Sequence, residues 1–144
     1  MGACKNYHYM NTTTDPNNVA LISSLYSSIA SGDVPTALGL MDEKIIWNEA
    51  ESNSLADGNP YIGPEAIVAG VFTRLGDMYK SFAIKVVELH DMSNDQVFAT
   101  LRYEITANTG QFYDVQAAHH WTLKGGKIVQ FQQYVDTKKL AEAE

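Results

Sequence analysis

The sequence predicts an α+β domain with a mostly antiparallel sheet. Helical patterns open the chain, one strand and a third helix follow, and residues 82–135 carry only strand patterns separated by turns. The resulting order, α-α-β-α-β-β-β-β, lacks the regular alternation of strands and helices that is typical of parallel sheets. At 144 residues, the chain has the length of one domain, which we place at residues 18–140.

Three helices are predicted from apolar spacing and end signals. A stripe with spacings of three and four begins after Asn18 and consists of Val19, Ile22, Tyr26 and Ile29. Gly32 suits the left-handed position that ends such a helix. Asp33 then caps a second, short helix that runs through Met41, and Pro64 opens the third helix.

Five strands are predicted from β-branched and aromatic runs bounded by turn residues. The first is the short segment 45–49, and the turn-rich segment 50–64 after it is long enough to suggest a functional loop. The other four strands form a continuous series, with Asn94-Asp95 and Gly125-Gly126 among its turns: 82–89, 97–106, 112–123 and 127–135.

Composition excludes several classes of function. The formal net charge of −7 argues against non-specific nucleic-acid binding and against docking on anionic lipid, since both require cations. A single cysteine, Cys4, excludes an intrachain disulfide and a cysteine-based zinc cluster. No apolar run approaches the ~18 residues that span a membrane. We therefore expect a soluble, cytoplasmic protein with a polar leader or loose arm over 1–17 and a tail over 141–144.

Glu49 is the first candidate for chemistry. On a strand it shares one face with Ile45 and Trp47, because side chains alternate with period two. A carboxylate beside an indole and away from water has a raised pKa, which suits a general base near neutral pH. The alternative is a solvated glutamate at the end of the strand.

His119 and Asp136 are the other catalytic candidates. His119 shares its strand face with Trp121, whereas His120 points to the opposite face, so the two histidines cannot chelate one metal ion. Asp136 shares a face with Tyr134 and is a natural partner for His119, whose tautomer it would fix. Alternatively, the histidine is a satisfied interior residue and Asp136 a solvated strand end or a cap.

Aromatic side chains are candidates for the wall of a cavity that takes a flat or apolar small molecule. Each can instead simply fill the core. The candidates are Tyr26, Trp47, Phe72, Tyr103, Trp121 and Tyr134.

Three segments carry a family resemblance over about residues 18–140. They are the helix–Gly-Asp–helix opening, the segment PYIGPEAI, and the C-terminal run AAHHWTLKGGKIVQFQQYVDT. Together they resemble the SnoaL-like, ketosteroid-isomerase-related proteins of the nuclear transport factor 2-like superfamily. The resemblance implies a cystatin-like cone, in which a strongly curved sheet wraps around a long helix and leaves a cavity at its open end. It also implies a homodimer.

The resemblance also implies roles for individual residues. Glu49 falls where the isomerases keep their base, and His119 falls where they keep the proton-donating acid of an oxyanion hole. Asp136 lies near an acid or base of the related cyclases and epoxide hydrolases. The isomerases have their tyrosine where this chain has Leu25, one residue before Tyr26, so the chain departs from the isomerase pattern there.

Two functions remain open from the sequence. The first is an isomerase, cyclase, dehydratase or hydrolase that uses placed acids and bases on a small carbonyl-type metabolite, without metal or other cofactor. The absence of nucleotide-binding and nucleophile-elbow motifs agrees with this. The second is a non-catalytic module of the same fold that binds a small ligand or dimerises. Convergence of Glu49, His119 and Asp136 on one open cavity would favour the enzyme.

Overall fold

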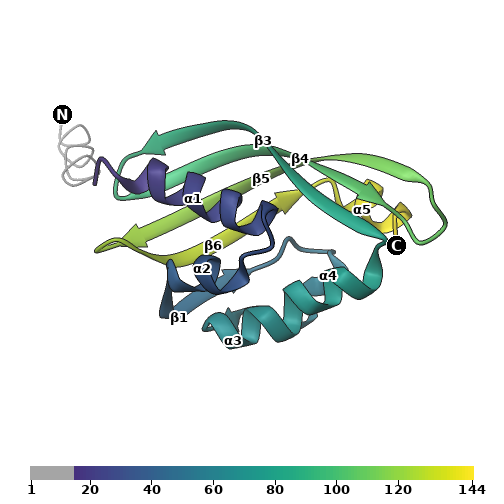
Figure 1. The fold of residues 1–144 in the computed structure, drawn as a ribbon, viewed down its shortest axis with the longest axis horizontal. Helices are drawn as coiled ribbons and strands as arrows, with labels where there is room; N and C mark the ends of the chain where they lie inside the picture. Colours follow the sequence, from purple (N-terminus) through teal and green to yellow (C-terminus); the bar gives the residue numbers. More distant parts are fainter. Residues whose placement is uncertain (1–14) are drawn as a thin grey trace, which may run out of the picture.

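Six strands form one curved sheet, and helices cover its concave face (Figure 1). The computed structural model of the chain describes residues 15–144, so most of the leader predicted over 1–17 lies outside the described residues. The strands lie in the order β2-β1-β6-β5-β4-β3. Their bounds are β1 Met41–Asn48, β2 Tyr61–Ile62, β3 Ser81–Met92, β4 Gln96–Thr106, β5 Phe112–Lys124 and β6 Lys127–Val135.

The sheet is antiparallel except where β1 lies parallel to β6. This confirms the predicted α+β class with its mostly antiparallel sheet. The β3–β4 turn uses Asn94 and Asp95, which both have positive φ, at 61° and 54°. Gly125 and Gly126 form the β5–β6 turn in the same left-handed region. Two positive φ values in a row are typical of the turns that match the twist of a hairpin.

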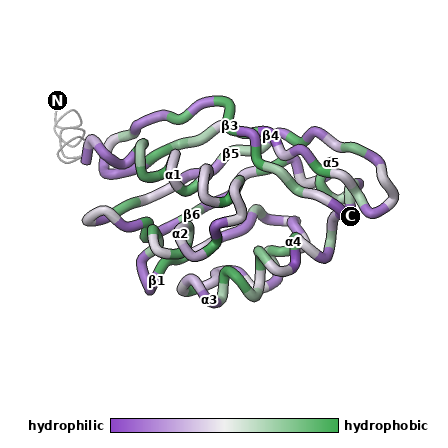
Figure 2. The backbone as a smooth tube through the Cα atoms, viewed as in Figure 1, coloured by the Kyte–Doolittle hydropathy of each residue, from purple (hydrophilic) through white to green (hydrophobic). Residues whose placement is uncertain are grey.

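Strict alternation along β4 and β5 determines which side chains enter the core. Every second residue of β4 from Val97 to Ile105 is buried, and the intervening residues face the other side. Figure 2 shows hydrophobic residues recurring along the central strands and the covering helices. Full burial of one large apolar side chain stabilises the fold by ~1.5–3 kcal/mol, so this row of residues contributes substantially to folding.

Helices α1 (Asn18–Ala30) and α2 (Val34–Gly39) cover one part of the concave face. Asp33 caps α2 as predicted, since its carboxylate accepts from Thr36 N at 3.2 Å. Gly32 adopts the expected left-handed conformation between the two helices, with φ +74°. The predicted second helix is too long, however, because Met41 pairs with Ile128 of β6 and so begins β1 instead.

A second helical segment covers the other part of the concave face and includes one π-helical turn. It consists of α3 (Pro64–Ile67), the π-helical η3 (Val68–Phe72) and α4 (Thr73–Met78). Gly70 lies against the ring of Tyr61, and a Cβ there would come within 2.1 Å of the ring. Only glycine therefore allows this close approach of helix and loop.

The segments around residue 60 and at the C-terminus are more ordered than the sequence predicted. The loop 50–64 contains the 3-10 turn η2 (Ser54–Gly58) and the short β2, which pairs with β1. The chain ends in α5 (Thr137–Glu142), a helix that the sequence analysis did not predict, and Ala143 after it is fully buried. Among residues 15–144, no helix has the length and apolar character needed to cross a membrane.

Candidate functional site

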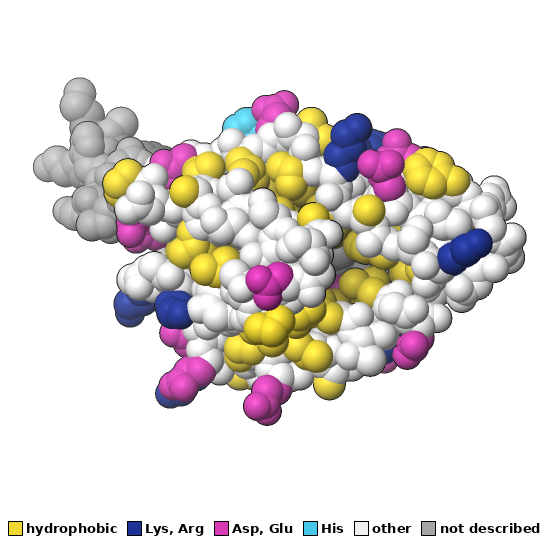
Figure 3. Space-filling model, in the orientation of Figure 1, with side chains coloured by type: hydrophobic (Ala, Val, Ile, Leu, Met, Phe, Trp, Pro, Cys, Tyr) yellow, Lys and Arg dark blue, Asp and Glu magenta, His cyan; other side chains and the backbone are white. Residues whose placement is uncertain are grey.

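A cavity of about 460 Å³ lies between the concave face of the sheet and the helices. Its wall draws on α1, β1, the η3–α4 segment, the start of β3 and the inner residues of the central strands. Figure 3 shows hydrophobic side chains gathered around a hollow on the face between β3 and α4. The cavity is thus mainly apolar, and its few polar side chains carry the chemistry.

Glu49 enters this cavity at the end of β1. Ile45, Trp47 and Glu49 are all buried, as expected for one strand face, and the glutamate is only 3% exposed. Burial raises the pKa of its carboxyl to about 7, while the hydrogen bond from Trp47 Nε1 to Oε2, at 3.2 Å, opposes that rise. No other side-chain hydrogen bond reaches the carboxyl from within residues 15–144. Near neutral pH the carboxyl is therefore partly protonated and partly ionised, so it can act as an acid or as a base.

The backbone of Glu49 is held by the side chain of Asn59 in the following loop. Asn59 Oδ1 accepts from Glu49 N at 2.9 Å, and Asn59 Nδ2 donates to Glu49 O at 2.8 Å. This reciprocal pair replaces the sheet hydrogen bonds that end with β1. It fixes the backbone from which the glutamate side chain extends into the cavity.

His119 lies in the cavity wall on β5, between two tyrosine hydroxyls. The Tyr26 hydroxyl is 2.7 Å from Nδ1, and the Tyr103 hydroxyl is hydrogen-bonded to Nε2. Burial lowers the pKa of His119 to about 3, so the imidazole is neutral at ordinary pH. His120 points to the opposite face of the sheet, as alternation requires, and packs against Phe98.

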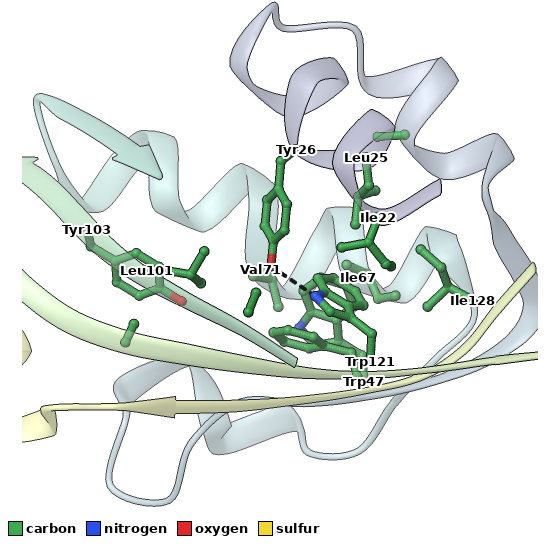
Figure 4. Close-up of a cluster of buried hydrophobic side chains, with 14 of the residues drawn as sticks. Ile22, Leu25, Tyr26, Trp47, Ile67, Val71, Leu101, Tyr103, Trp121 and Ile128 are labelled. Atoms are coloured by element: carbon green, nitrogen blue, oxygen red, sulfur yellow. Dashed lines mark hydrogen bonds between the residues drawn. The ribbon is translucent and has the colours of Figure 1, made fainter. Parts of the chain in front are cut away.

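Each tyrosine hydroxyl also accepts a hydrogen bond from a second side chain. Trp121 Nε1 donates to the Tyr26 hydroxyl at 2.9 Å, as the dashed line in Figure 4 shows. Gln133 Nε2 donates to the Tyr103 hydroxyl at 3.0 Å. Burial raises the pKa of both tyrosines well above the usual value, and the charge of Glu49 raises that of Tyr103 further. Both hydroxyls therefore remain protonated donors at neutral pH.

Gln133 joins this cluster to the loop that follows Glu49. Its Oε1 accepts from Ala50 N at 3.0 Å and from Asn53 Nδ2 at 2.8 Å. Asn53 is held in turn, because its own Oδ1 accepts from Leu55 N at 3.1 Å. One side chain thus contacts both halves of the polar site.

Five of the six aromatic candidates from the sequence line the cavity. Tyr134 is 54% exposed on the outer face, so its predicted place on the cavity wall is wrong. The five that line the cavity are Tyr26, Trp47, Phe72, Tyr103 and Trp121. Trp47 and Trp121 both pack against Phe131, with ring centroids 3.9 and 4.5 Å apart, and leave the cavity open.

Asp136 is also outside the cavity, and the expected pair with His119 does not form. Its carboxylate accepts from Lys139 N at 3.1 Å and caps α5, and both ring nitrogens of His119 are bonded to tyrosines. The reason is strand parity: Phe131 and Gln133 face the core, so Tyr134 and Asp136 face away from it. Of the three predicted catalytic residues, the structure brings together Glu49 and His119.

Sequence reasoning did not predict the roles that the amide side chains have in the site. Gln133, Asn53 and Asn59 hold the tyrosine–histidine cluster and the backbone around Glu49. Only Gln133 leaves a signal, as a polar residue on a strand face shared with Phe131. Within residues 15–144, no three His, Cys, Asp or Glu side chains lie close enough together to hold a metal ion.

Comparisons with known proteins agree with this architecture. A family model described as a SnoaL-like domain matches residues 22–131. The chain is similar to an NTF2-like protein from Burkholderia thailandensis, at 29% identity and a TM-score of 0.81, covering 92% of this chain and 98% of that one. No curated protein matches the chain.

Two further solved structures share the fold at lower identity. TerC, co-crystallised with polyporic acid, is 20% identical with a TM-score of 0.79, covering 88% of this chain and 96% of that one. IdmH from Streptomyces antibioticus, a proposed polyketide cyclase, is 16% identical with a TM-score of 0.75, covering 88% and 96%. At these identities the similarity establishes the fold alone.

Proposed function

The chain belongs to the SnoaL-like family, as its sequence resemblance predicted, and we propose that it is a cofactor-independent acid–base enzyme for a small, largely apolar carbonyl compound. The reaction class is isomerisation, intramolecular aldol cyclisation, dehydration or epoxide opening. These reactions need only a base, a hydrogen-bond donor and a dry pocket. One observation carries the proposal: a buried carboxyl with a pKa of about 7 shares a cavity with two protonated tyrosine hydroxyls.

Glu49 is the proposed base. A pKa near the ambient pH gives a useful fraction of carboxylate and still leaves it basic enough to take a proton from carbon. The side chain is held by Trp47 and its backbone by Asn59, so its carboxyl is placed before a substrate enters. Such placement lowers the entropic part of the barrier.

The proposed donor to the substrate oxygen is the hydroxyl of Tyr26 or of Tyr103, which lie on either side of His119. Negative charge that develops on a carbonyl oxygen after proton loss is stabilised most by donors that are already oriented in a water-poor site. The neutral imidazole orients both hydroxyls and adds no charge of its own.

Aromatic walls favour a flat substrate. Trp47, Phe72 and Trp121 surround the space next to Glu49 and His119. The structural relatives agree with this choice, since one is a proposed polyketide cyclase and another was crystallised with polyporic acid. We therefore expect planar, aromatic or polyketide-like carbonyl compounds.

Proton exchange on a model ketone tests the proposal. We expect the protein to catalyse the exchange of the α-hydrogens of 2-tetralone, a flat bicyclic ketone, for deuterium in D₂O, followed by ¹H NMR. Glu49→Gln should lower the catalysed rate by ~10²–10⁴-fold, the usual contribution of a general base. Glu51→Gln, which removes an exposed carboxylate two residues away, is the matched control and should leave the rate unchanged.

The same assay separates the enzyme from the non-catalytic alternative. Saturable binding of 2-tetralone without any catalysed exchange would support a small-ligand-binding module. An unchanged rate of catalysed exchange in Glu49→Gln would show that Glu49 is not the base.

We further propose that the chain forms a homodimer through the outer face of the sheet. This face carries exposed Tyr134 and Ile46, and it buries two polar atoms without a hydrogen-bond partner within residues 15–144, Thr100 Oγ1 and His120 Nε2. A second copy of the chain would cover the apolar side chains and provide polar partners. Sedimentation should give a dimer that Ala118→Arg, in the middle of this face, dissociates; a wild-type monomer at micromolar concentration would contradict the proposal.

A further inference from the structure

Five side chains form one chain of hydrogen bonds across the cavity wall: Trp121, Tyr26, His119, Tyr103 and Gln133. Both ends of this chain have a fixed polarity. The indole nitrogen of Trp121 can only donate. The amide of Gln133 is oriented by the N–H of Ala50, which must meet its oxygen at 3.0 Å, so its NH₂ group faces Tyr103.

The Tyr26 oxygen therefore accepts from Trp121, and the Tyr103 oxygen accepts from Gln133. Four hydrogen bonds link the five side chains. Trp121, each tyrosine and the neutral imidazole have one such hydrogen, and Gln133 directs one of its two amide hydrogens at Tyr103, which makes five hydrogens in this region. Four bonds use four of these hydrogens, so one hydrogen is left over.

We propose that this remaining hydrogen always belongs to a tyrosine hydroxyl, and that His119 moves it between Tyr26 and Tyr103 by exchanging its tautomers. When Nδ1 carries the hydrogen, it donates to the Tyr26 oxygen, Tyr103 donates to Nε2, and the Tyr26 O–H is free. When Nε2 carries the hydrogen, the roles reverse and the Tyr103 O–H is free. This inference concerns the site of the proposed function and rests on that function for its role in turnover.

The free hydroxyl defines the chemical class of ligand. Both tyrosines line the cavity, so the spare hydrogen can reach an oxygen acceptor there. A carbonyl, enolate or phenolate oxygen satisfies it, whereas a hydrocarbon leaves it unpaired, which costs ~1–3 kcal/mol in a buried site. The tautomers offer two places for that oxygen, one at a time.

The same series of hydrogen bonds can carry a proton without charging the histidine. When a substrate oxygen takes the hydrogen of Tyr103, Nε2 gives its hydrogen to the Tyr103 oxygen, and Tyr26 gives its hydrogen to Nδ1. A water or a second hydroxyl of the substrate then gives a proton to the Tyr26 oxygen and takes over the negative charge that the first substrate oxygen has lost. Each tyrosine oxygen loses one hydrogen and gains one, and the imidazole loses one at Nε2 and gains one at Nδ1, so the ring stays neutral. The low pKa of His119 agrees with a relay that avoids the imidazolium form.

Nitrogen NMR of histidine-labelled full-length protein tests this directly, since a bare ring nitrogen resonates far downfield of a protonated one. In Tyr26→Phe we expect Nε2 to carry the hydrogen, because the alternative leaves an N–H without an acceptor, the rarer case in folded proteins. Tyr103→Phe should show the opposite tautomer, with the hydrogen on Nδ1. Tyr134→Phe, on the outer face, is the matched control and should leave the wild-type signals unchanged.

A second measurement uses the unmodified protein. Saturation with 2-tetralone should shift the His119 tautomer population, because the ketone oxygen fixes one hydroxyl as its donor. Tetralin, which has the same shape without the oxygen, should not shift it. The same tautomer in both phenylalanine variants, an imidazolium signal at pH 7, or equal responses to the two ligands would overturn the inference. None of these readouts needs turnover, so failure of Glu49 as a base and failure of the relay are separate results.

Discussion

Two carboxylates follow the ends of neighbouring parallel strands, and their environments differ sharply. Glu49 comes directly after β1 and Asp136 directly after β6. Glu49 continues the inward face of its strand, is buried, and has a raised pKa. Asp136 continues the outward face, is exposed, and caps α5. The position at a strand end is therefore shared, and the parity of the strand decides whether the carboxylate serves chemistry or local structure.

The largest expected difference between them is in catalysis. Glu49→Asp keeps the carboxylate but withdraws it by one methylene, and a displacement of ~1 Å in a placed group can cost about 10²-fold in rate. Asp136→Glu makes the reverse change in length on the outer face and should leave the exchange of 2-tetralone unchanged. Equal losses in the two variants, measured under identical conditions, would show that the contrast in burial has no functional meaning.

The next effect is on stability, and it depends on pH. In the unfolded chain the Glu49 carboxyl ionises near its ordinary pKa of 4.5, but in the folded protein it ionises only near 7. Between these values the unfolded state gives up a proton that the folded state keeps, so the carboxyl destabilises the fold increasingly as the pH rises. At ~1.4 kcal/mol per unit, the cost above pH 7 is roughly 3 kcal/mol.

Glu49→Gln removes this cost. The variant should match the wild type in free energy of unfolding at pH 4 and exceed it by up to ~3 kcal/mol at pH 8, as measured by urea denaturation. Glu51→Gln, again the matched control, should show no such trend. A constant difference between Glu49→Gln and the wild type at all pH values would mean that the carboxyl is not held neutral by burial.

The contrast between the carboxylates also shows how far the sequence can predict the site. Trp47 and Glu49 keep simple alternation, and Trp47 lies in regular register opposite Phe131, so period two correctly places both inward. On the neighbouring strand the ladder shifts register opposite Thr122 and Leu123. This shift reverses the faces relative to Ile128, so alternation counted from Ile128 places Tyr134 and Asp136 inward, whereas the regular pairing from Gln130 to Val135 places them outward.

The fold was predictable because its signals are local. The hydrogen-bonded side chains around His119 were not predictable, because their contacts join distant parts of the sequence. Hairpin turns such as Asn94-Asp95 and the Asp33 cap need only neighbouring residues, and the structure contains them. The cluster around His119 joins Tyr26 from α1 to residues of three strands, and no spacing along the chain encodes those contacts. The helix α5 had a local signal, the capping carboxylate of Asp136, but it was assigned to chemistry instead.

A smaller effect tests the structural role of Asp136. Asp136→Ala removes the cap of α5 and should lower the free energy of unfolding by ~1 kcal/mol, whereas Asp136→Asn keeps a capping oxygen and should cost little. The helix matters because Leu140 lines the cavity and Ala143 is fully buried. If Asn and Ala are equally destabilising, charge rather than capping is the contribution of Asp136.

The smallest effect concerns how Trp47 tunes Glu49. The indole N–H donates to the carboxylate at 3.2 Å and opposes the rise in pKa caused by burial, so Trp47→Phe should raise the pKa of Glu49 further above about 7. The bond is long, and we expect a contribution of roughly 0.5 kcal/mol, at the low end for hydrogen bonds. The acid limb of the pH profile for 2-tetralone exchange should therefore move to higher pH. Movement to lower pH would mean that the indole stabilises the protonated carboxyl, and that burial alone then accounts for less of the difference between Glu49 and Asp136.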